Sequence, residues 1–188
     1  MMFSRTNRLL LRPGFAEDAP VLARLMADKG IAMATARVPH PYSEDDARKW
    51  LAMPADPTLP RCLILMRTGG TPILVGGIGL ERKAKGTVEL GYWVARSYWG
   101  RGIATEAARA VIEIARTLGV KRIEAAHFLD NPASGRVLEK LGFRPTGIVA
   151  PVSSCAREEE APARHLGLDL DEVEIGWTCE RELDVVAA

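Results

Sequence analysis

The chain has 188 residues, of which 47% are hydrophobic and 26% charged, and its formal net charge is +1. This composition is typical of a globular domain that buries a core, and the near-neutral charge excludes binding to nucleic acid or an anionic membrane through bulk charge alone. The sequence has no internal repeat or linker, so we expect one domain over residues 1–188.

The first half of the sequence predicts a strand, two helices and then a run of strands. A leucine-rich strand spans residues 8–12, and residues 16–27 carry apolar side chains at helical spacing. A second helix begins after Ser43, a good N-cap, and ends near Met53. Three consecutive strands follow at residues 61–67, 73–80 and 87–95.

In the second half, helices alternate with strands. A long helix spans residues 102–118 and ends at Gly119, a residue type favoured just past helix ends. The polar segment 150–164, with prolines and an acidic run, is interpreted as a mobile loop. The remaining expected elements are a strand at 122–127, a helix at 131–141, and strands at 143–149 and 173–178.

This order of elements predicts an α/β (α+β) fold built on one mixed central sheet with helices on both faces. Strands alternate with helices in part of the chain but run consecutively in the middle. Consecutive strands exclude a purely parallel, doubly wound sheet, so a mixed sheet of about seven strands is expected.

The N-terminus and the cysteines bear on the compartment. Residues 1–8 lack the apolar stretch of a signal peptide, and the longest apolar run is too short to cross a bilayer. The three cysteines are widely spaced and share no metal-ligand spacing with the histidines. We therefore expect a cytoplasmic protein with reduced thiols and no metal.

Two glycines mark the point where the third consecutive strand leads into the long helix. Gly100 and Gly102 flank Arg101, and a backbone without a β-carbon can approach a ligand closely. The first amides of a helix have no partner within the helix and attract an anion. The turn therefore predicts a phosphate or pyrophosphate site with Arg101 as an added cation, although both the Walker and the dinucleotide glycine patterns are absent.

The motif from Trp99 to Ala104, WGRGIA, resembles the pyrophosphate-binding turn of GNAT-type N-acetyltransferases, which usually have Arg or Gln at the position of Trp99. A wider set of segments resembles the ribosomal-protein N-terminal acetyltransferase (RimJ/RimL-like) branch. These segments are NRLLLRP, PHPYSEDDARKWLA, VELGYWV, YWGRGIATEA and NPASGRVLEKLGF. The resemblance implies a GNAT fold, with a sheet that splays open between its fourth and fifth strands, and acetyl-CoA as co-substrate.

The resemblance also implies which residues hold acetyl-CoA. The pantetheine arm would lie between the splayed strands, the helix amides would hold the pyrophosphate, and Asn131 would reach the pantetheine. Taken without the family, Asn131 followed by Pro132 is also typical of a helix N-cap. The expected cofactor contacts are Trp93, Val94, Trp99, Gly100, Arg101, Gly102, Ile103, Ala104, Thr105, Asn131 and Ser134.

Attack of an amine on a thioester needs a neutral amine, and a base helps to supply it. Deprotonation at pH ~7.4 costs about 4 kcal/mol for a lysine and about 0.5 kcal/mol for an α-amine, so a base acting through water suffices for the latter. Glu89 is the first candidate, on a strand face shared with Gly91 and Trp93; a solvent-facing strand glutamate is the alternative. Glu106 is the second candidate base, although it also fits a support for the glycine turn. Glu81 is the third candidate.

The departing thiolate benefits from a hydrogen-bond donor. Many GNAT enzymes place a Tyr where this chain has Leu138, and the resemblance places Ser134 near the CoA sulfur instead. Alternatively, Ser134 is a serine in the first turn of the helix whose side chain accepts a hydrogen bond from a backbone amide. Glu89 and Ser134 are thus the expected catalytic residues, and Tyr42 and Tyr92 the expected acceptor-side residues.

Together these features predict direct acetyl transfer from acetyl-CoA to a primary amine, with a protein or peptide α-amine as the leading acceptor. A small amine (an amino acid, polyamine or aminoglycoside) and a non-catalytic acyl-CoA sensor are the alternatives. No cysteine lies in the motif regions, so a covalent acyl-enzyme is not expected. Neither nucleic acid nor membrane is an expected partner, and a homodimer stays open.

Overall fold

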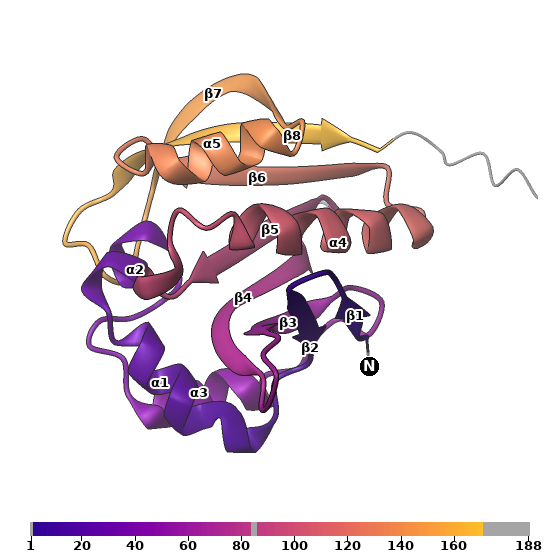
Figure 1. Cartoon of the computed structure of the whole chain (residues 1–188). Coiled ribbons are helices and arrows are strands. Elements are labelled where there is room, and N and C mark those ends of the chain that lie inside the picture. Colours follow the sequence, from indigo (N-terminus) through magenta and orange to yellow (C-terminus); the bar gives the residue numbers. More distant parts are fainter. Residues whose placement is uncertain (1, 84–85, 171–188) are drawn as a thin grey trace, which may run out of the picture.

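The computed structural model describes residues 2–83 and 86–170. In this part of the chain one eight-stranded sheet has the order β1-β2-β3-β4-β5-β6-β8-β7 (Figure 1). Its strands are β1 (Ser4–Arg5), β2 (Leu9–Arg12), β3 (Arg61–Met66), β4 (Ile73–Arg82), β5 (Val88–Val94), β6 (Arg122–Phe128), β7 (Arg144–Val152) and β8 (Ala161–Asp169). Its α-helices are α1 (Ala19–Met26), α2 (Lys29–Ala34), α3 (Glu44–Ala52), α4 (Ile103–Thr117) and α5 (Pro132–Lys140).

The sheet is mixed, as the sequence predicts. Neighbouring strands pair antiparallel except β5 and β6, which are parallel and are joined by α4. A parallel pair requires such a crossover, whereas β3, β4 and β5 follow one another along the chain as antiparallel neighbours. The predicted α/β fold is therefore confirmed.

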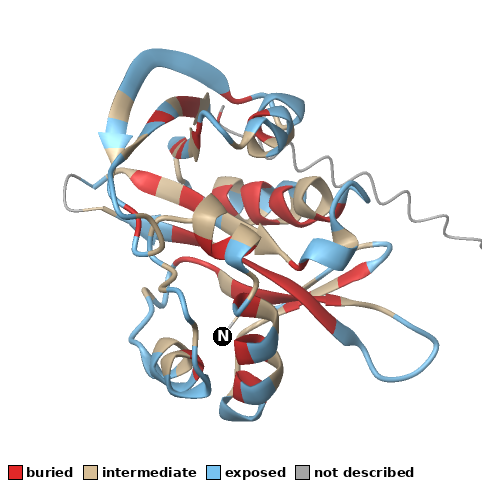
Figure 2. Ribbon diagram, turned by 90° about the vertical axis from the view of Figure 1, so that its left-hand side faces the viewer, coloured by how far each residue is buried: buried red, intermediate tan, exposed pale blue. Residues whose placement is uncertain are grey.

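The side chains of β3 alternate between two core clusters, one on each face of the sheet. Ile64 packs in the cluster that contains Ile103 of α4 and Leu138 of α5. Leu63 packs in the cluster that contains Leu22 of α1. Figure 2 shows the buried positions as red bands along the central strands and along the inner side of α4. Successive residues of a strand point to opposite faces, so helices cover both sides of the sheet.

The sheet forks between β5 and β6. Val88 pairs with Ile123 and Glu89 with Glu124, and no further β5–β6 pair occurs among the described residues. Beyond the fork β5 continues to Val94 and β6 to Phe128. This confirms the predicted splay between the fourth and fifth expected strands.

The segment 150–164 is not the mobile loop that the sequence predicts. β7 continues to Val152 and β8 begins at Ala161, so only residues 153–160 connect them. The prolines that suggested a loop, Pro151 and Pro162, lie opposite each other in the β7–β8 ladder. β7 is the outer strand of the sheet, and an edge strand accepts a proline such as Pro151. Pro162 lies at the start of β8, as its second residue.

Two short elements, β1 and α2, were not predicted, and both are stabilised by contacts that sequence periodicity does not reveal. The side chain of Asp28 caps α2 by accepting hydrogen bonds from the amides of Gly30 and Ile31. The predicted strand at 173–178 lies outside the described residues. Among the residues that are described, no helix combines the length and apolarity needed to cross a bilayer.

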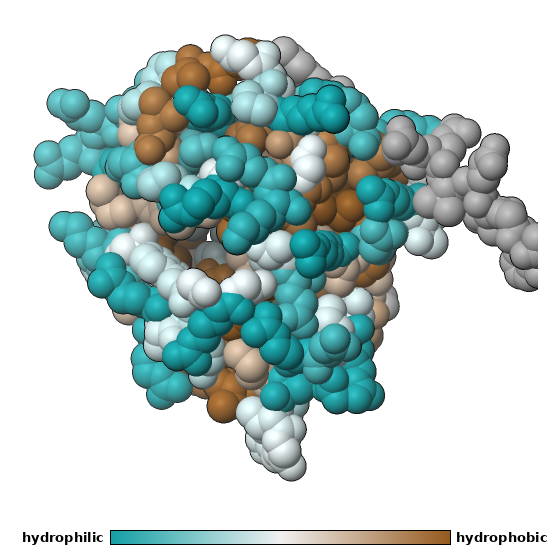
Figure 3. Space-filling model, turned by 45° about the horizontal axis from the view of Figure 1, so that its top comes forward, coloured by the Kyte–Doolittle hydropathy of each residue, from teal (hydrophilic) through white to brown (hydrophobic). Residues whose placement is uncertain are grey.

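The outer strand β7 is largely exposed. Ile148 and Val149 are 56% and 50% exposed. Figure 3, in which the top of the molecule comes forward, shows apolar side chains among hydrophilic ones along this edge.

Candidate active site

A cavity of about 830 Å³ opens at the fork of the sheet. On one side it is lined by β4, β5, β6 and the start of α5. On the other side it is lined by the segment from the end of α2 through α3. The fork therefore gives access from one face of the sheet to the other, as transfer between two bound molecules requires.

Glu89 lies at the fork itself, in the last residue pair between β5 and β6. Its Oε1 is 3.2 Å from Nζ of Lys83, and its side chain is 38% exposed. Glu89 and Trp93 both line the cavity, and the alternation along β5 puts them on the face covered by α1. A water-accessible carboxylate at this point fits a base that acts through water, which stays a prediction.

Glu81 lies directly across from Glu89, on β4. Its carboxylate contacts the guanidinium of Arg37 and lies 3.4 Å from Nζ of Lys83. The hydrogen bond from Arg37 holds the pKa of Glu81 below its usual value. A carboxylate engaged by two cations is a poor proton acceptor, so the geometry favours Glu89 over Glu81.

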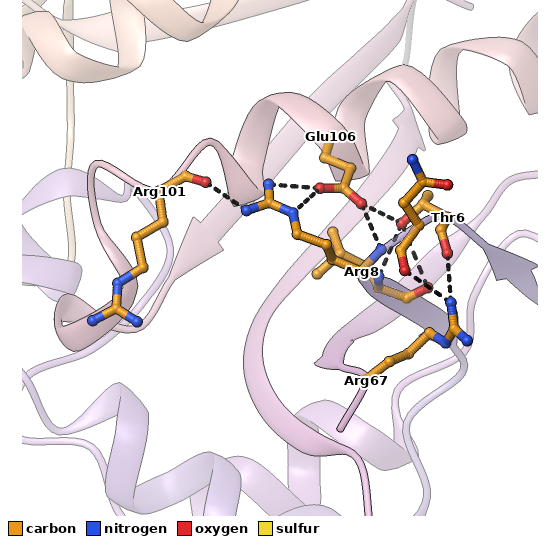
Figure 4. Close-up of polar contacts among 7 residues, drawn as sticks. Thr6, Arg8, Arg67, Arg101 and Glu106 are labelled. Atoms are coloured by element: carbon orange, nitrogen blue, oxygen red, sulfur yellow. Dashed lines mark hydrogen bonds and ion pairs between the residues drawn. The ribbon is translucent and has the colours of Figure 1, made fainter. Parts of the chain in front are cut away.

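Glu106 is turned away from the cavity and supports the glycine turn. Its carboxylate accepts hydrogen bonds from Oγ1 of Thr6 at 2.6 Å and from Nε of Arg8 at 2.7 Å (Figure 4). Burial opposes the charged form, but these hydrogen bonds hold the pKa of Glu106 below its usual value. The sequence allows Glu106 to be either a candidate base or a support for the glycine turn, and the structure matches the second interpretation.

Tyr92 and Ser134 meet where β5 faces the first turn of α5. The Tyr92 hydroxyl is 2.8 Å from Oγ of Ser134 and 3.3 Å from its carbonyl oxygen. Burial raises the pKa of Tyr92 to about 12, so the phenol stays protonated near neutral pH. Sequence reasoning placed Tyr92 on the acceptor side and missed this pair. The period of two along β5 was the available signal, because it turns Tyr92 away from Glu89.

Asn131 caps α5, since its Oδ1 accepts a hydrogen bond of 3.2 Å from the amide of Ser134. The predicted contact between Asn131 and pantetheine is compatible with this cap, because an amide side chain also carries donors. Leu138, at the usual tyrosine position, is 1% exposed and belongs to the core.

The glycine turn has the backbone that the sequence predicts for an anion site. Gly100 and Gly102 have φ values of 72° and 74°, a region that only glycine adopts at little cost. Gly102 is the N-cap of α4 and supplies no side-chain cap to the helix amides. The amides of the first turn, Ile103 to Thr105, thus lack a capping side chain, and buried Ile103 anchors the turn to the core.

Trp99 attaches the glycine turn to β5. Its indole Nε1 donates a hydrogen bond of 2.6 Å to the carbonyl of Val94, and the guanidinium of Arg96 stacks on the ring. The Val94 carbonyl thus already accepts one hydrogen bond, and the predicted pairing of pantetheine with this strand stays a prediction. Trp99 itself is 47% exposed. Arg101 is exposed and stacks on Tyr98.

Tyr42, in the loop between α2 and α3, lines the wall of the cavity that the segment from α2 through α3 forms. Burial raises the pKa of Tyr42 to about 12, with a smaller contribution from the charge of Asp46. The hydroxyl of Tyr42 therefore stays protonated near neutral pH, and its predicted contact with the acceptor would be that of a neutral group.

The loop 153–160 holds this wall in place, a role that sequence reasoning missed because it took the segment to be mobile. Oγ of Ser154 donates to the carbonyl of Thr35 at 2.8 Å, and Nη2 of Arg157 donates to that of Met33 at 2.6 Å. Arg157 also forms a bidentate ion pair with Asp130, the residue before the α5 cap. One guanidinium thus connects this wall with the helix that carries Ser134.

In the described part of the chain, no cluster of three or more His, Cys, Asp or Glu side chains is arranged to hold a metal ion.

Known proteins are similar to this chain in sequence and in structure. A family model described as an acetyltransferase (GNAT) domain matches residues 8–144. The uncharacterized N-acetyltransferase p20 of Bacillus licheniformis is 30% identical over 149 residues, which are 77% of this chain and 83% of p20.

Two solved structures share the fold. One is RimL, a ribosomal L7/L12 α-N-protein acetyltransferase in complex with coenzyme A, with a TM-score of 0.75 at 17% identity over 91% of this chain and 99% of that one. The other is the microcin C7 self-immunity acetyltransferase MccE in complex with acetyl-CoA and AMP. Its TM-score is 0.74 at 18% identity, over 88% of this chain and 94% of MccE.

Proposed function

Because this chain belongs to the GNAT family and is an acetyl-CoA-dependent N-acetyltransferase, we propose that its acceptor is the α-amine of a protein or peptide. The observation that carries this proposal is the position of Glu89: a half-buried carboxylate at the fork, beside a cavity of about 830 Å³. Less is demanded of such a base, acting through water, by an α-amine than by a lysine, whose deprotonation costs more.

The charges around the cavity support an acceptor that is not a polycation. Glu81 and Glu89 line the cavity, but Lys83 lies beside both and Arg37 pairs with Glu81. Since these carboxylates are already compensated by cations, a polyamine or aminoglycoside gains little from them. RimL, which shares the fold, acts by its name on a protein α-amine.

The proposed reaction is a direct transfer. The acceptor ammonium first loses a proton through water to Glu89. The neutral amine then attacks the thioester carbonyl carbon, the carbon–sulfur bond breaks, and the second amine proton leaves with the sulfur as the free CoA thiol. The first amides of α4 hold the diphosphate of acetyl-CoA, and the Tyr92–Ser134 pair faces the departing sulfur. We further propose that residues 1–188 form one catalytic domain, because β7 and β8 complete the same sheet beyond residue 144.

Tyr92 is proposed as a hydrogen-bond donor and not as an acid. Its pKa of about 12 lies several units above that of an ordinary thiol, about 8.5. Full proton transfer to the thiolate is therefore uphill. When the Tyr92 hydroxyl donates to Oγ of Ser134, the Ser134 proton is free to stabilise the sulfur.

The test is release of free CoA thiol from acetyl-CoA with a panel of amines. Two peptides of the same sequence are compared, one with a free N-terminus and acetylated lysines, the other with an acetylated N-terminus and free lysines. The proposal predicts turnover with the first peptide only. Turnover confined to amino acids, polyamines or aminoglycosides would assign a small-molecule acceptor, and binding of acetyl-CoA without thiol release from any amine would assign a sensor.

A further inference from the structure

Arg8, in the turn between β1 and β2, reaches across to the glycine turn at the start of α4 (Figure 4). Its Nη1 donates a hydrogen bond of 3.1 Å to the carbonyl of Arg101. Its Nη2 lies 2.6 Å from Oε2 of Glu106, and its backbone amide donates to Oε1 at 3.1 Å. Residues almost a hundred positions apart therefore meet beside the expected diphosphate site.

The hydrogen bond to Arg101 has a consequence for the next residue. The carbonyl of Arg101 and the amide of Gly102 belong to one planar, trans peptide unit, so the two groups point in opposite directions. Glycines with positive φ stand on both sides of Arg101, and glycine permits many peptide orientations. The hydrogen bond from Arg8 to the Arg101 carbonyl fixes one orientation of the Arg101–Gly102 peptide. In that orientation the Gly102 amide points away from Arg8.

The turn that carries Arg8 is itself anchored. Nη1 of Arg67, just after β3, donates to the carbonyls of Thr6 at 3.1 Å and Asn7 at 2.9 Å. The amide of Arg67 donates to the carbonyl of Arg8 at 2.7 Å, and Oγ1 of Thr6 donates to Glu106 at 2.6 Å. The turn that carries Arg8 is thus held both by the sheet and by α4.

We propose that Arg8 is a positioning residue for acetyl-CoA: clamped by Glu106, it orients the Arg101–Gly102 peptide so that the Gly102 amide faces the diphosphate. The inference rests on the proposed function, in which the start of α4 holds that group. Glu106 balances the charge of Arg8 and occupies its Nε and Nη2. Arg8 therefore acts through the backbone and not as a free cation on the phosphate.

The test compares acetyl-CoA with S-acetylpantetheine, which carries the same thioester but no phosphate. Arg8→Gln should lower kcat/KM for acetyl-CoA by roughly tenfold or more, because the hydrogen bond from the Gly102 amide to the charged diphosphate is lost. It should leave kcat/KM for S-acetylpantetheine within about twofold. Glu106→Gln should give the same selective loss, since Arg8 is then no longer clamped.

Two further variants separate position from charge and from folding. Arg8→Lys keeps the charge but cannot contact Glu106 and Arg101 together, so the loss should persist. Arg116→Ala breaks an ion pair with Glu113 near the other end of α4 and should leave the ratio of the two substrates unchanged. Thermal unfolding of each variant reports on folding.

An equal loss on both substrates in Arg8→Gln and Glu106→Gln would overturn the inference, as would full rescue by Arg8→Lys. Failure of the proposed function looks different. In that case the wild-type protein would itself have the same kcat/KM for S-acetylpantetheine as for acetyl-CoA, or would release no thiol from either.

Discussion

The hydroxyl of Tyr92 lies 2.8 Å from Oγ of Ser134, although Tyr92 belongs to β5 and Ser134 to α5. The contact joins a strand at the fork to the first turn of the helix beside it. A leaving group bound between β5 and β6 would be close to this pair. The Tyr92 hydroxyl of the pair stays protonated near neutral pH, so it can donate a hydrogen bond.

Tyr92→Phe and Ser134→Ala should each reduce kcat by roughly two- to tenfold, the size of one hydrogen bond. The double variant should lose little more than the larger single effect, because the two hydroxyls act in series. Steady-state kinetics with acetyl-CoA and the preferred amine measure this. Losses that simply multiply would show that the hydroxyls act independently.

Glu89→Gln should lower kcat by about 10²-fold or more, the usual contribution of general base catalysis, with the affinity for acetyl-CoA unchanged. Glu81→Gln is the matched control, since Glu81 lies directly across from Glu89 but is bound by Arg37. It should alter kcat much less. Titration calorimetry and initial rates over a range of pH provide the comparison, and wild-type rates for Glu89→Gln at every pH would remove Glu89 as the base.

Gly102→Val should abolish measurable binding of acetyl-CoA, because a β-branched residue is strained at φ 74° and the turn must rearrange. Gly119, with φ 73°, follows the other end of α4 and has no atom within 4 Å of an added Cβ. Gly119→Val therefore carries a similar strain far from the turn. It should lower thermal stability and leave acetyl-CoA affinity intact in calorimetry; equal affinities of the two variants would contradict the assignment of the turn.

The ion pair between Arg12 and Asp18 should make stability depend on pH. Both side chains are largely buried, with two contacts of 2.7 Å. Burial disfavours the charge of Asp18, but hydrogen bonds from Arg12 and the Phe15 amide hold its pKa below the usual value. A lowered folded-state pKa means that the stabilisation is complete above pH ~4 and is lost as pH falls through the folded-state pKa.

Asp18→Asn should therefore lower the free energy of unfolding by roughly 3 kcal/mol at pH 7, because Arg12 is left buried without its partner. The difference from wild type should shrink as the pH falls below about 4. Urea unfolding at a series of pH values measures it, and a difference that does not change with pH would show that the pair contributes no linked protonation.

Periodicity and turn residues sufficed to predict most of the fold. The strand β3, the helix α4 and the glycines at both ends of that helix follow from local patterns, and the structure has these elements where expected. β8 could not be predicted in the same way. Pro162 and the acidic residues before it are typical of a loop, and only the pairing with β6 and β7 makes this segment a strand.

The candidate site shows the same limit. The glycine turn is contiguous in sequence and was identified directly. The contacts of Arg8 with Arg101, of Tyr92 with Ser134 and of Arg157 with Met33 join distant segments. No spacing in the sequence encodes such contacts, because they depend on how the strands and helices pack.

The most direct test of the account is a crystal structure of the protein with coenzyme A bound. We predict that the diphosphate oxygens lie within hydrogen-bonding distance of the backbone amides from Gly102 to Thr105, with the pantetheine arm passing between β5 and β6 toward Ser134. A diphosphate bound away from these amides, or a pantetheine arm outside the fork, would contradict the account.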